Sequence, residues 1–145
     1  MNLIIDGRGK KKILVQLMVT FYERYLKVEK SKCTLLVQLR KDMIKEVDAN
    51  GMTTKVADVV IIAIDTSLQY DDFIRTFAHE MVHVKQLIRG TLRFNDGNIG
   101  VWRGKALDVP YLKKPWEIEA LREQELMARQ FNEFIDKYAC LQDSM

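Results

Sequence analysis

The two histidines of this 145-residue chain stand four residues apart, in the segment HEMVH at residues 79–83. The segment lies inside a run of helical periodicity over 71–89, which ends before Gly90, a residue that often terminates helices. Residues four apart share one face of a helix, so both imidazoles can bind one metal ion. A catalytic zinc site also needs a third protein ligand and an open position for water.

The third ligand has to be a carboxylate or a thiolate, because the chain holds no third histidine. A closing helix is predicted over 115–138, since Pro115 is a favoured first-turn residue and apolar positions follow at helical spacing. On a helical wheel Glu117 falls within about 40° of the centre of the apolar side, and Glu119 about 120° away. A carboxylate that faces a core is costly unless it is paired or binds a metal. We therefore expect Glu117 as the ligand, with Glu119 and Asp108 as alternatives; the other interpretation of Glu117 is a first-turn carboxylate favoured by the helix dipole.

Glu80 directly follows the first histidine. Zinc lowers the pKa of a bound water toward about 7, and a neighbouring carboxylate can take its proton during attack on a carbonyl. We expect Zn²⁺ as the cofactor, held in part by His79 and His83, with Glu80 as general base. Such chemistry also needs a donor for the oxyanion, and Tyr111 and Tyr70, each just before a predicted helix, are the candidates. The simpler interpretation of each is an aromatic side chain that only packs. The competing interpretation is a pair of histidines that is only hydrogen-bonded in a helix interface.

Two further polar residues, Gln86 and Thr76, share the face of the histidines. We expect both to be hydrogen-bonded groups near the metal. Met81 and Val82 are expected in the core. Trp102 lies at the tip of a predicted hairpin, where it either lines a cleft or covers the core.

The rest of the pattern predicts a single α+β domain over residues 1–145, with a small, mostly antiparallel sheet. Asn50-Gly51 is predicted to be a two-residue hairpin turn, and the apolar run over 59–64 an inner strand covered on both faces. The predicted elements are a helix over 10–28, strands over 33–39, 43–48, 53–57 and 59–64, a helix over 71–89, a short β region over 91–107 and a helix over 115–138.

Composition excludes several classes of protein. Apolar residues make up 48% of the chain and charged residues 30%, as in globular proteins and unlike disordered ones. The longest apolar run, over 59–64, is far too short to cross a membrane. Cys33 and Cys140 form no CxxC motif, so we expect free thiols and neither a disulfide nor a cysteine-type zinc site. The first residues have no small-residue cleavage site of a signal peptide, so we expect a cytoplasmic protein.

The formal charge of +3 comes largely from the beginning of the chain. A basic surface there could bind nucleic acid or an acidic partner, whereas the simpler interpretation is a solvated helix face. The basic residues of this region are Arg8, Lys10, Lys11, Lys12, Arg24, Lys27, Lys30 and Lys32.

HEMVHVKQ at 79–86, followed by PWEIEA at 115–120, resembles the gluzincin class of zinc metallopeptidases. The similarity covers about residues 55–130 and is greatest to the small zincin-like peptidases encoded by tailed bacteriophages and bacteria. In that class a glutamate three residues before a small residue, on a helix after HExxH, is the third ligand, which implies Glu117 with Ala120. The class often has aspartate directly after the small residue, and this chain has Leu121 there.

The resemblance implies a zincin-like domain that hydrolyses peptide bonds of a protein or peptide substrate. A strand beside the histidine helix could pair with an extended peptide. The alternative function is a binding module, in which a catalytically dormant zincin fold grips a host or partner protein.

Overall fold

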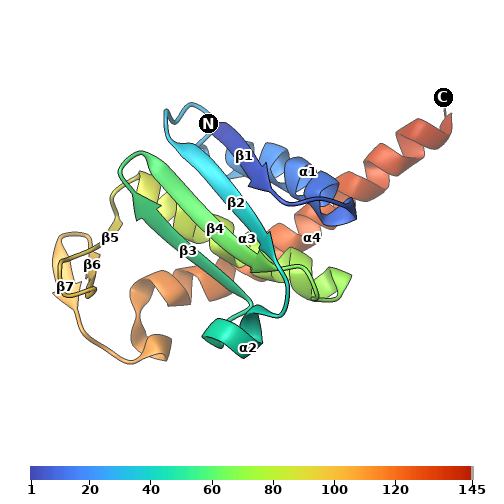
Figure 1. Ribbon diagram of the computed structural model, residues 1–145. Coiled ribbons are helices and arrows are strands. Elements are labelled where there is room, and N and C mark those ends of the chain that lie inside the picture. Colours follow the sequence, from blue (N-terminus) through green and yellow to red (C-terminus); the bar gives the residue numbers. More distant parts are fainter. Residues whose placement is uncertain (145) are drawn as a thin grey trace.

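The structure is a computed structural model that describes residues 1–144, and it describes side chains as far as residue 139. Figure 1 shows a four-stranded sheet with the three long helices on one face and a small second sheet at one end. This arrangement confirms the α+β class. Cys33 is a free cysteine, while the predicted thiol of Cys140 lies outside the described side chains.

The order of the elements follows the predicted alternation, except that one strand is added at the start and a short helix replaces the strand predicted over 43–48. They are β1 (Asn2–Asp6), α1 (Lys10–Tyr25), β2 (Thr34–Arg40), α2 (Met43–Val47), β3 (Gly51–Val56), β4 (Val59–Asp65), α3 (Tyr70–Ile88), β5 (Leu92–Phe94), β6 (Gly100–Trp102), β7 (Lys105–Leu107), the 3-10 turn η1 (Tyr111–Lys113) and α4 (Pro115–Ser144).

The larger sheet has the strand order β1-β2-β4-β3. β1 pairs parallel to β2, β2 pairs parallel to β4, and only the edge strand β3 is antiparallel to its neighbour. The prediction of a mostly antiparallel sheet is therefore wrong for this sheet. One cause is β1, which the pattern did not predict: the chain crosses back through α1 before it enters β2, so these two strands are parallel. The other is that β3 takes the outer edge beyond β4, which leaves β2 to pair parallel with β4.

The segment between β2 and β4 also differs from the prediction. Residues 43–48 hold the short helix α2 instead of a strand. The hairpin turn lies at Ala57-Asp58, where Ala57 has φ of +53°, and not at Asn50-Gly51. The Asn50 carbonyl already accepts a bond from the N–H of Asp65, so the paired strand begins there.

The apolar strand β4 is an inner strand, as predicted, because it pairs on both edges. Only one of its faces is fully covered. Val60, Ile62 and Ile64 have no exposed surface and point toward the helices, whereas Val59 and Ile61 on the other face are half-buried. The expectation that both faces are covered is wrong for these positions, since all three long helices lie on the same side of the sheet (Figure 1).

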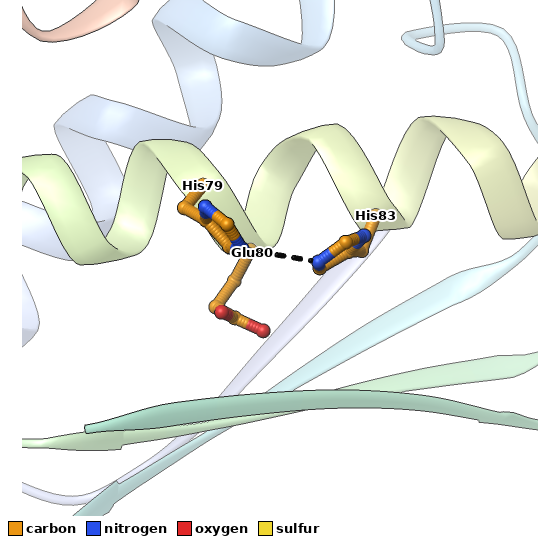
Figure 2. A group of neighbouring side chains, drawn as sticks. All are labelled: His79, Glu80 and His83. Carbon is orange, nitrogen blue, oxygen red and sulfur yellow. Dashed lines mark hydrogen bonds between the residues drawn. The ribbon is translucent and has the colours of Figure 1, made fainter. Parts of the chain in front are cut away.

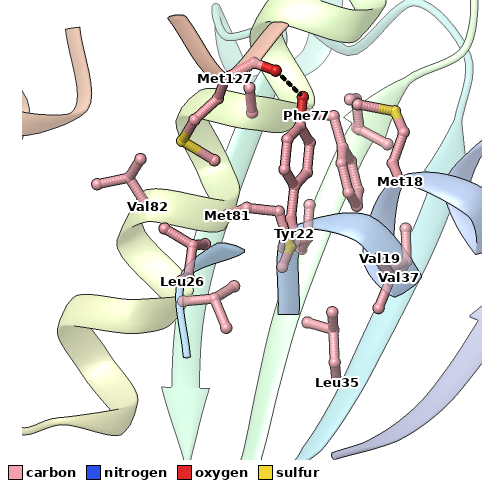
Figure 3. Close-up of a cluster of buried hydrophobic side chains, with 14 of the residues drawn as sticks. Met18, Val19, Tyr22, Leu26, Leu35, Val37, Phe77, Met81, Val82 and Met127 are labelled. Atoms are coloured by element: carbon pink, nitrogen blue, oxygen red, sulfur yellow. Dashed lines mark hydrogen bonds between the residues drawn. The ribbon is translucent and has the colours of Figure 1, made fainter. Parts of the chain in front are cut away.

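The core lies between the sheet and α1, α3 and α4 (Figure 3). Tyr22 of α1 is fully buried, and its hydroxyl donates to the Met127 carbonyl of α4 over 3.0 Å. Met81 and Val82 lie in this core, as predicted. Each such side chain contributes about 1.5–3 kcal/mol on burial, so the core holds α3 firmly against the sheet.

The predicted β region over 91–107 forms the second sheet, β5-β6-β7, which is antiparallel throughout. Gly90 ends α3 with φ of +72°, the conformation expected of a glycine at a helix end. None of the helices within residues 1–144 is both long enough and apolar enough to cross a membrane.

Candidate metal centre

The two histidines project from α3 toward the first turn of α4, on the side of α3 that does not enter the core. Figure 2 shows both imidazoles on one side of α3, while Glu80 extends from the helix toward the strands. The ring centroids of His79 and His83 lie 4.9 Å apart, and both side chains are about one tenth exposed. The local helical spacing therefore produces the predicted pair.

Glu117 is brought to the histidines by the packing of its neighbour Trp116. The Trp116 indole is buried against Gly100 of β6, where a Cβ would lie 2.2 Å from the ring. Phe94 of β5 meets the same indole edge to face, with ring centroids 6.4 Å apart. The second sheet thus fixes the start of α4 and the direction of the Glu117 side chain.

Three ligand-type atoms meet at this point. Glu117 Oε1 lies 2.9 Å from His79 Nε2 and 3.1 Å from His83 Nε2, and the two nitrogens are 3.2 Å apart. Around a tetrahedral zinc ion with bonds of about 2.0–2.1 Å, neighbouring ligand atoms lie about 3.3 Å apart. The three atoms form a triangle of almost this size, so the residues fit such an ion.

Gln86 determines which nitrogen of His83 faces this triangle. The Gln86 amide group donates to the Trp116 carbonyl and to Glu119 Oε1, both at 3.1 Å. Its Oε1 therefore faces His83 Nδ1, at 2.8 Å, and the Nδ1–H must be the donor. In the neutral ring the Nε2 lone pair then points at Glu117, as a metal ligand requires.

Gln124 of α4 has the same relation to His79. Its Oε1 lies 2.7 Å from His79 Nδ1, and its amide nitrogen donates to Glu125 Oε1 at 3.3 Å. His79 Nε2 is thus also left as an acceptor. Two glutamines thus stand behind the two rings.

The site carries opposed charges. Burial is the largest effect on both histidines and lowers their pKa. The hydrogen bonds to Glu117, the charge of Glu80 and the bonds to Gln124 and Gln86 together outweigh it, so each pKa lies above its ordinary value. Burial raises the pKa of Glu117, yet the bonds from His79 and His83 hold this pKa well below its usual range. Glu117 is therefore an anion that attracts a cation, either a proton on the rings or a metal ion.

Glu80 lies between α3 and the edge strand β3. Its side chain is 6% exposed, and Oε1 accepts a bond from the Thr53 hydroxyl at 2.8 Å. Burial raises the pKa of Glu80, whereas His83, His79 and the Thr53 hydroxyl lower it. The effect of burial is larger, so the pKa lies above its ordinary value. The ligand-type atoms of His79, Glu80 and His83 all lie within 4.8 Å of one another, so this buried group could hold a metal ion.

Of the two tyrosines predicted as oxyanion donors, only Tyr111 lies at the site. The Tyr111 hydroxyl donates to Glu117 Oε1 at 3.0 Å, so this residue joins the site. Burial first, and then the charge of Glu117, raise the pKa of Tyr111, and the phenol keeps its proton. Tyr70, the first residue of α3, instead donates to Asn132 of α4, and it does not line the cleft described below.

The two alternative carboxylates lie outside the triangle. Glu119 is behind His83, where it accepts from Gln86 and lies 3.6 Å from the Lys85 ammonium. Asp108 is exposed and does not line the cleft. The side chain that reaches both Nε2 atoms is that of Glu117.

A cleft of about 630 Å³ opens beside this group. Its lining combines the residues that follow α2 and begin β3 with residues of α3, β5 and α4. Thr76 lines it, as expected for its place on the histidine face. The lining residues are Asp48, Ala49, Asn50, Gly51, Met52, Thr53, Arg75, Thr76, His79, Glu80, His83, Leu87, Leu92, Phe94, Tyr111, Trp116, Glu117, Leu121 and Gln124.

Sequence reasoning missed the roles of Gln124 and Thr53. Gln124 had a usable signal, since it shares the apolar side of the predicted last helix, where an amide needs a partner. Thr53 had none, because its contact with Glu80 depends on how β3 packs against α3. The chain matches no known family model, no curated protein and no solved structure.

Proposed function

We propose that the protein is a cytoplasmic zinc-dependent metallopeptidase that hydrolyses peptide bonds, with the metal held by His79, His83 and Glu117. One observation carries the proposal. Three acceptor atoms converge within 2.9–3.2 Å of one another beside an open cleft, and the rings are oriented from behind by glutamine oxygens. Acceptors that approach so closely repel one another unless a proton or a metal ion lies between them.

The donor set supports zinc. Two imidazole nitrogens and one carboxylate oxygen, with the cleft alongside, correspond to a catalytic site that keeps a position free, whereas structural zinc sites are closed by four protein ligands. Bound zinc would supply an activated water and polarise the carbonyl under attack. Of the two nearby carboxylates, Glu117 meets both rings, and Glu80 is held by Thr53 instead.

Glu80 is suited to general base catalysis. Burial raises its pKa, which brings a carboxylate closer to the neutral range in which a general base both takes and returns a proton. Tyr111 is suited to stabilise the oxyanion, because it keeps its proton and its hydroxyl lies at the metal ligand Glu117, 3.0 Å from Oε1.

The edge strand β3 supports an extended peptide as the substrate. In an antiparallel pair, every second residue hydrogen-bonds its backbone to the partner strand, and the Asp65 N–H to Asn50 carbonyl bond shows which residues of β3 do so. The backbone N–H and C=O groups of Gly51, Thr53 and Lys55 therefore face the free edge of the sheet. Gly51 and Thr53 also line the cleft. A peptide added at this edge would pass directly in front of Glu80.

The test combines metal analysis with a peptide library. We expect one zinc ion per chain, loss of zinc in His83→Ala, and cleavage that disappears in Glu80→Gln while zinc is retained. An unchanged zinc content in His83→Ala would contradict the proposed metal site. Zinc without cleavage by the wild type would favour the binding module that grips a host or partner protein.

A further inference from the structure

The edge strand β3 touches the side chain of Glu80 at two positions. The Thr53 hydroxyl lies 2.8 Å from Glu80 Oε1 and 3.5 Å from the Glu80 carbonyl oxygen. Two residues earlier, a Cβ at Gly51 would lie 3.1 Å from Glu80 Cγ and 3.3 Å from Cδ. The glutamate side chain is thus confined between α3 and β3, with little room to change rotamer.

The two oxygens of this carboxylate have different surroundings. Oε1 accepts the Thr53 hydroxyl, and within the described residues no hydrogen bond is formed by Oε2. No buried side-chain oxygen or nitrogen of the described part lacks a partner. Because Glu80 lines the cleft, Oε2 is the oxygen that opens toward it.

Thr53 also belongs to the free edge of the sheet. Its backbone groups face outward by the alternation of the β3–β4 hairpin, while its side chain faces α3. One residue therefore offers its backbone to a strand-like substrate and its hydroxyl to the general base. The neighbouring Thr54 has an exposed side chain on the opposite face, where it touches neither group.

We propose that Thr53 is a positioning residue for Glu80: its hydroxyl holds Oε1, so that Oε2 is presented to the cleft for proton transfer. The inference rests on the proposed peptidase function. A substrate that pairs with the edge at Thr53 would further restrain the same residue, which links substrate binding to the alignment of the base. A base displaced by about 1 Å loses on the order of 100-fold in rate, so this contact affects turnover more than binding.

The first test compares three variants on a peptide that the wild type cleaves, after equal zinc content has been verified. Thr53→Val removes the hydroxyl and keeps the shape, and we expect kcat to fall about 10- to 100-fold with KM changed less than about threefold. Thr53→Ser restores the hydroxyl, and kcat should return to within about threefold of the wild type. Thr54→Val is the matched control and should leave both constants unchanged. A wild-type kcat in Thr53→Val, or a serine variant as slow as the valine variant, overturns the positioning role.

The second test needs neither metal nor substrate. In metal-free protein, Thr53→Val should lower the urea midpoint of unfolding, and the same change in a Glu80→Ala background, which keeps only the 3.5 Å contact with the backbone carbonyl, should have a clearly smaller effect. Equal shifts in both backgrounds would show that the hydroxyl does not hold Glu80. If the wild type cleaves no peptide, the proposed function fails and the positioning role with it. A cleaving wild type with an unaffected Thr53→Val variant overturns the positioning role alone.

Discussion

The Nδ1–H of His83 donates to Oε1 of Gln86 over 2.8 Å, and Gln86 is itself fixed by two acceptors on α4. An outer hydrogen bond of this kind orients a ligand ring and makes its other nitrogen a better donor to metal. Gln86 therefore connects His83 on α3 with the helix that carries Glu117.

Replacing Gln86 by leucine should weaken zinc binding about 10- to 100-fold, the usual effect of losing a partner behind a ligand histidine. The side-chain volume changes little, so α3 should stay folded. Competition with a chromophoric chelator measures the dissociation constant. Gln16→Leu, at an exposed position of α1, is the matched control and should bind zinc like the wild type. An unchanged constant in Gln86→Leu would contradict the ring-orienting role.

The third ligand can be identified by three parallel substitutions. Glu117→Gln should weaken zinc binding by more than about 100-fold, because it removes the charge that meets both Nε2 atoms. Glu119→Gln should have a smaller effect, since Glu119 contacts Gln86 and not the triangle. Asp108→Asn should have none, as this residue is exposed. Zinc content after gel filtration distinguishes the three, and full zinc in Glu117→Gln would point to another carboxylate.

Gly100→Ala tests how the second sheet supports the site. The added Cβ would lie 2.2 Å from the buried Trp116 indole, and we expect a loss of about 1–3 kcal/mol in the free energy of unfolding. Zinc affinity should fall as well, because Trp116 directly precedes Glu117. Gly97→Ala, where the nearest atom would be 3.5 Å away, is the control and should be nearly neutral. Urea unfolding measures both variants, and equal midpoints would contradict the close packing.

The hydrogen bonds of the Asp65 carboxylate should make the free energy of unfolding depend on pH. Burial raises its pKa, but hydrogen bonds from Ser67 and from the N–H groups of Asp42 and Met43 outweigh burial and hold the pKa below its ordinary value. A lowered folded-state pKa stabilises the protein above the unfolded pKa of about 3.9, and this stability is lost as the pH falls through the folded-state value.

Asp65→Asn should therefore cost about 1–3 kcal/mol at pH 7, and the difference from the wild type should shrink as the pH falls below about 4. Urea unfolding between pH 7 and pH 2.5 measures this difference. Asp96→Asn, at an exposed turn, is the control with little effect at any pH. A difference that does not depend on pH would contradict the role of the charged carboxylate.

Local features were predictable where neighbouring residues determine the geometry. The two histidines meet because α3 is a helix, and that helix follows from periodicity and from Gly90. The turn between β5 and β6 forms around Asn95, whose Oδ1 accepts from the N–H groups of Gly97 and Ile99. Such contacts span a few residues, so the sequence pattern contains them.

Other features were decided by partners far along the chain. Residues 43–48 resemble a strand, yet they form α2, where the Asp65 carboxylate accepts the N–H groups of Asp42 and Met43. Asn50-Gly51 resembles a hairpin turn, but pairing with β4 makes it the beginning of a strand. Contacts with distant residues outweighed local preference in both cases: hydrogen bonds to Asp65 in the first, and strand pairing in the second.

The sequence by itself determined that two histidines share a helix face, that Glu80 stands beside them and that a later helix presents Glu117 on its apolar side. The same helical spacing placed Gln86 beside His83. Only the tertiary structure decided that α4 anchors the Gln86 amide, that Gln124 stands behind His79 and that Thr53 holds Glu80. Helical spacing is a property of neighbouring residues, whereas a hydrogen bond between residues 45 or 27 positions apart requires that the core first pack their elements together.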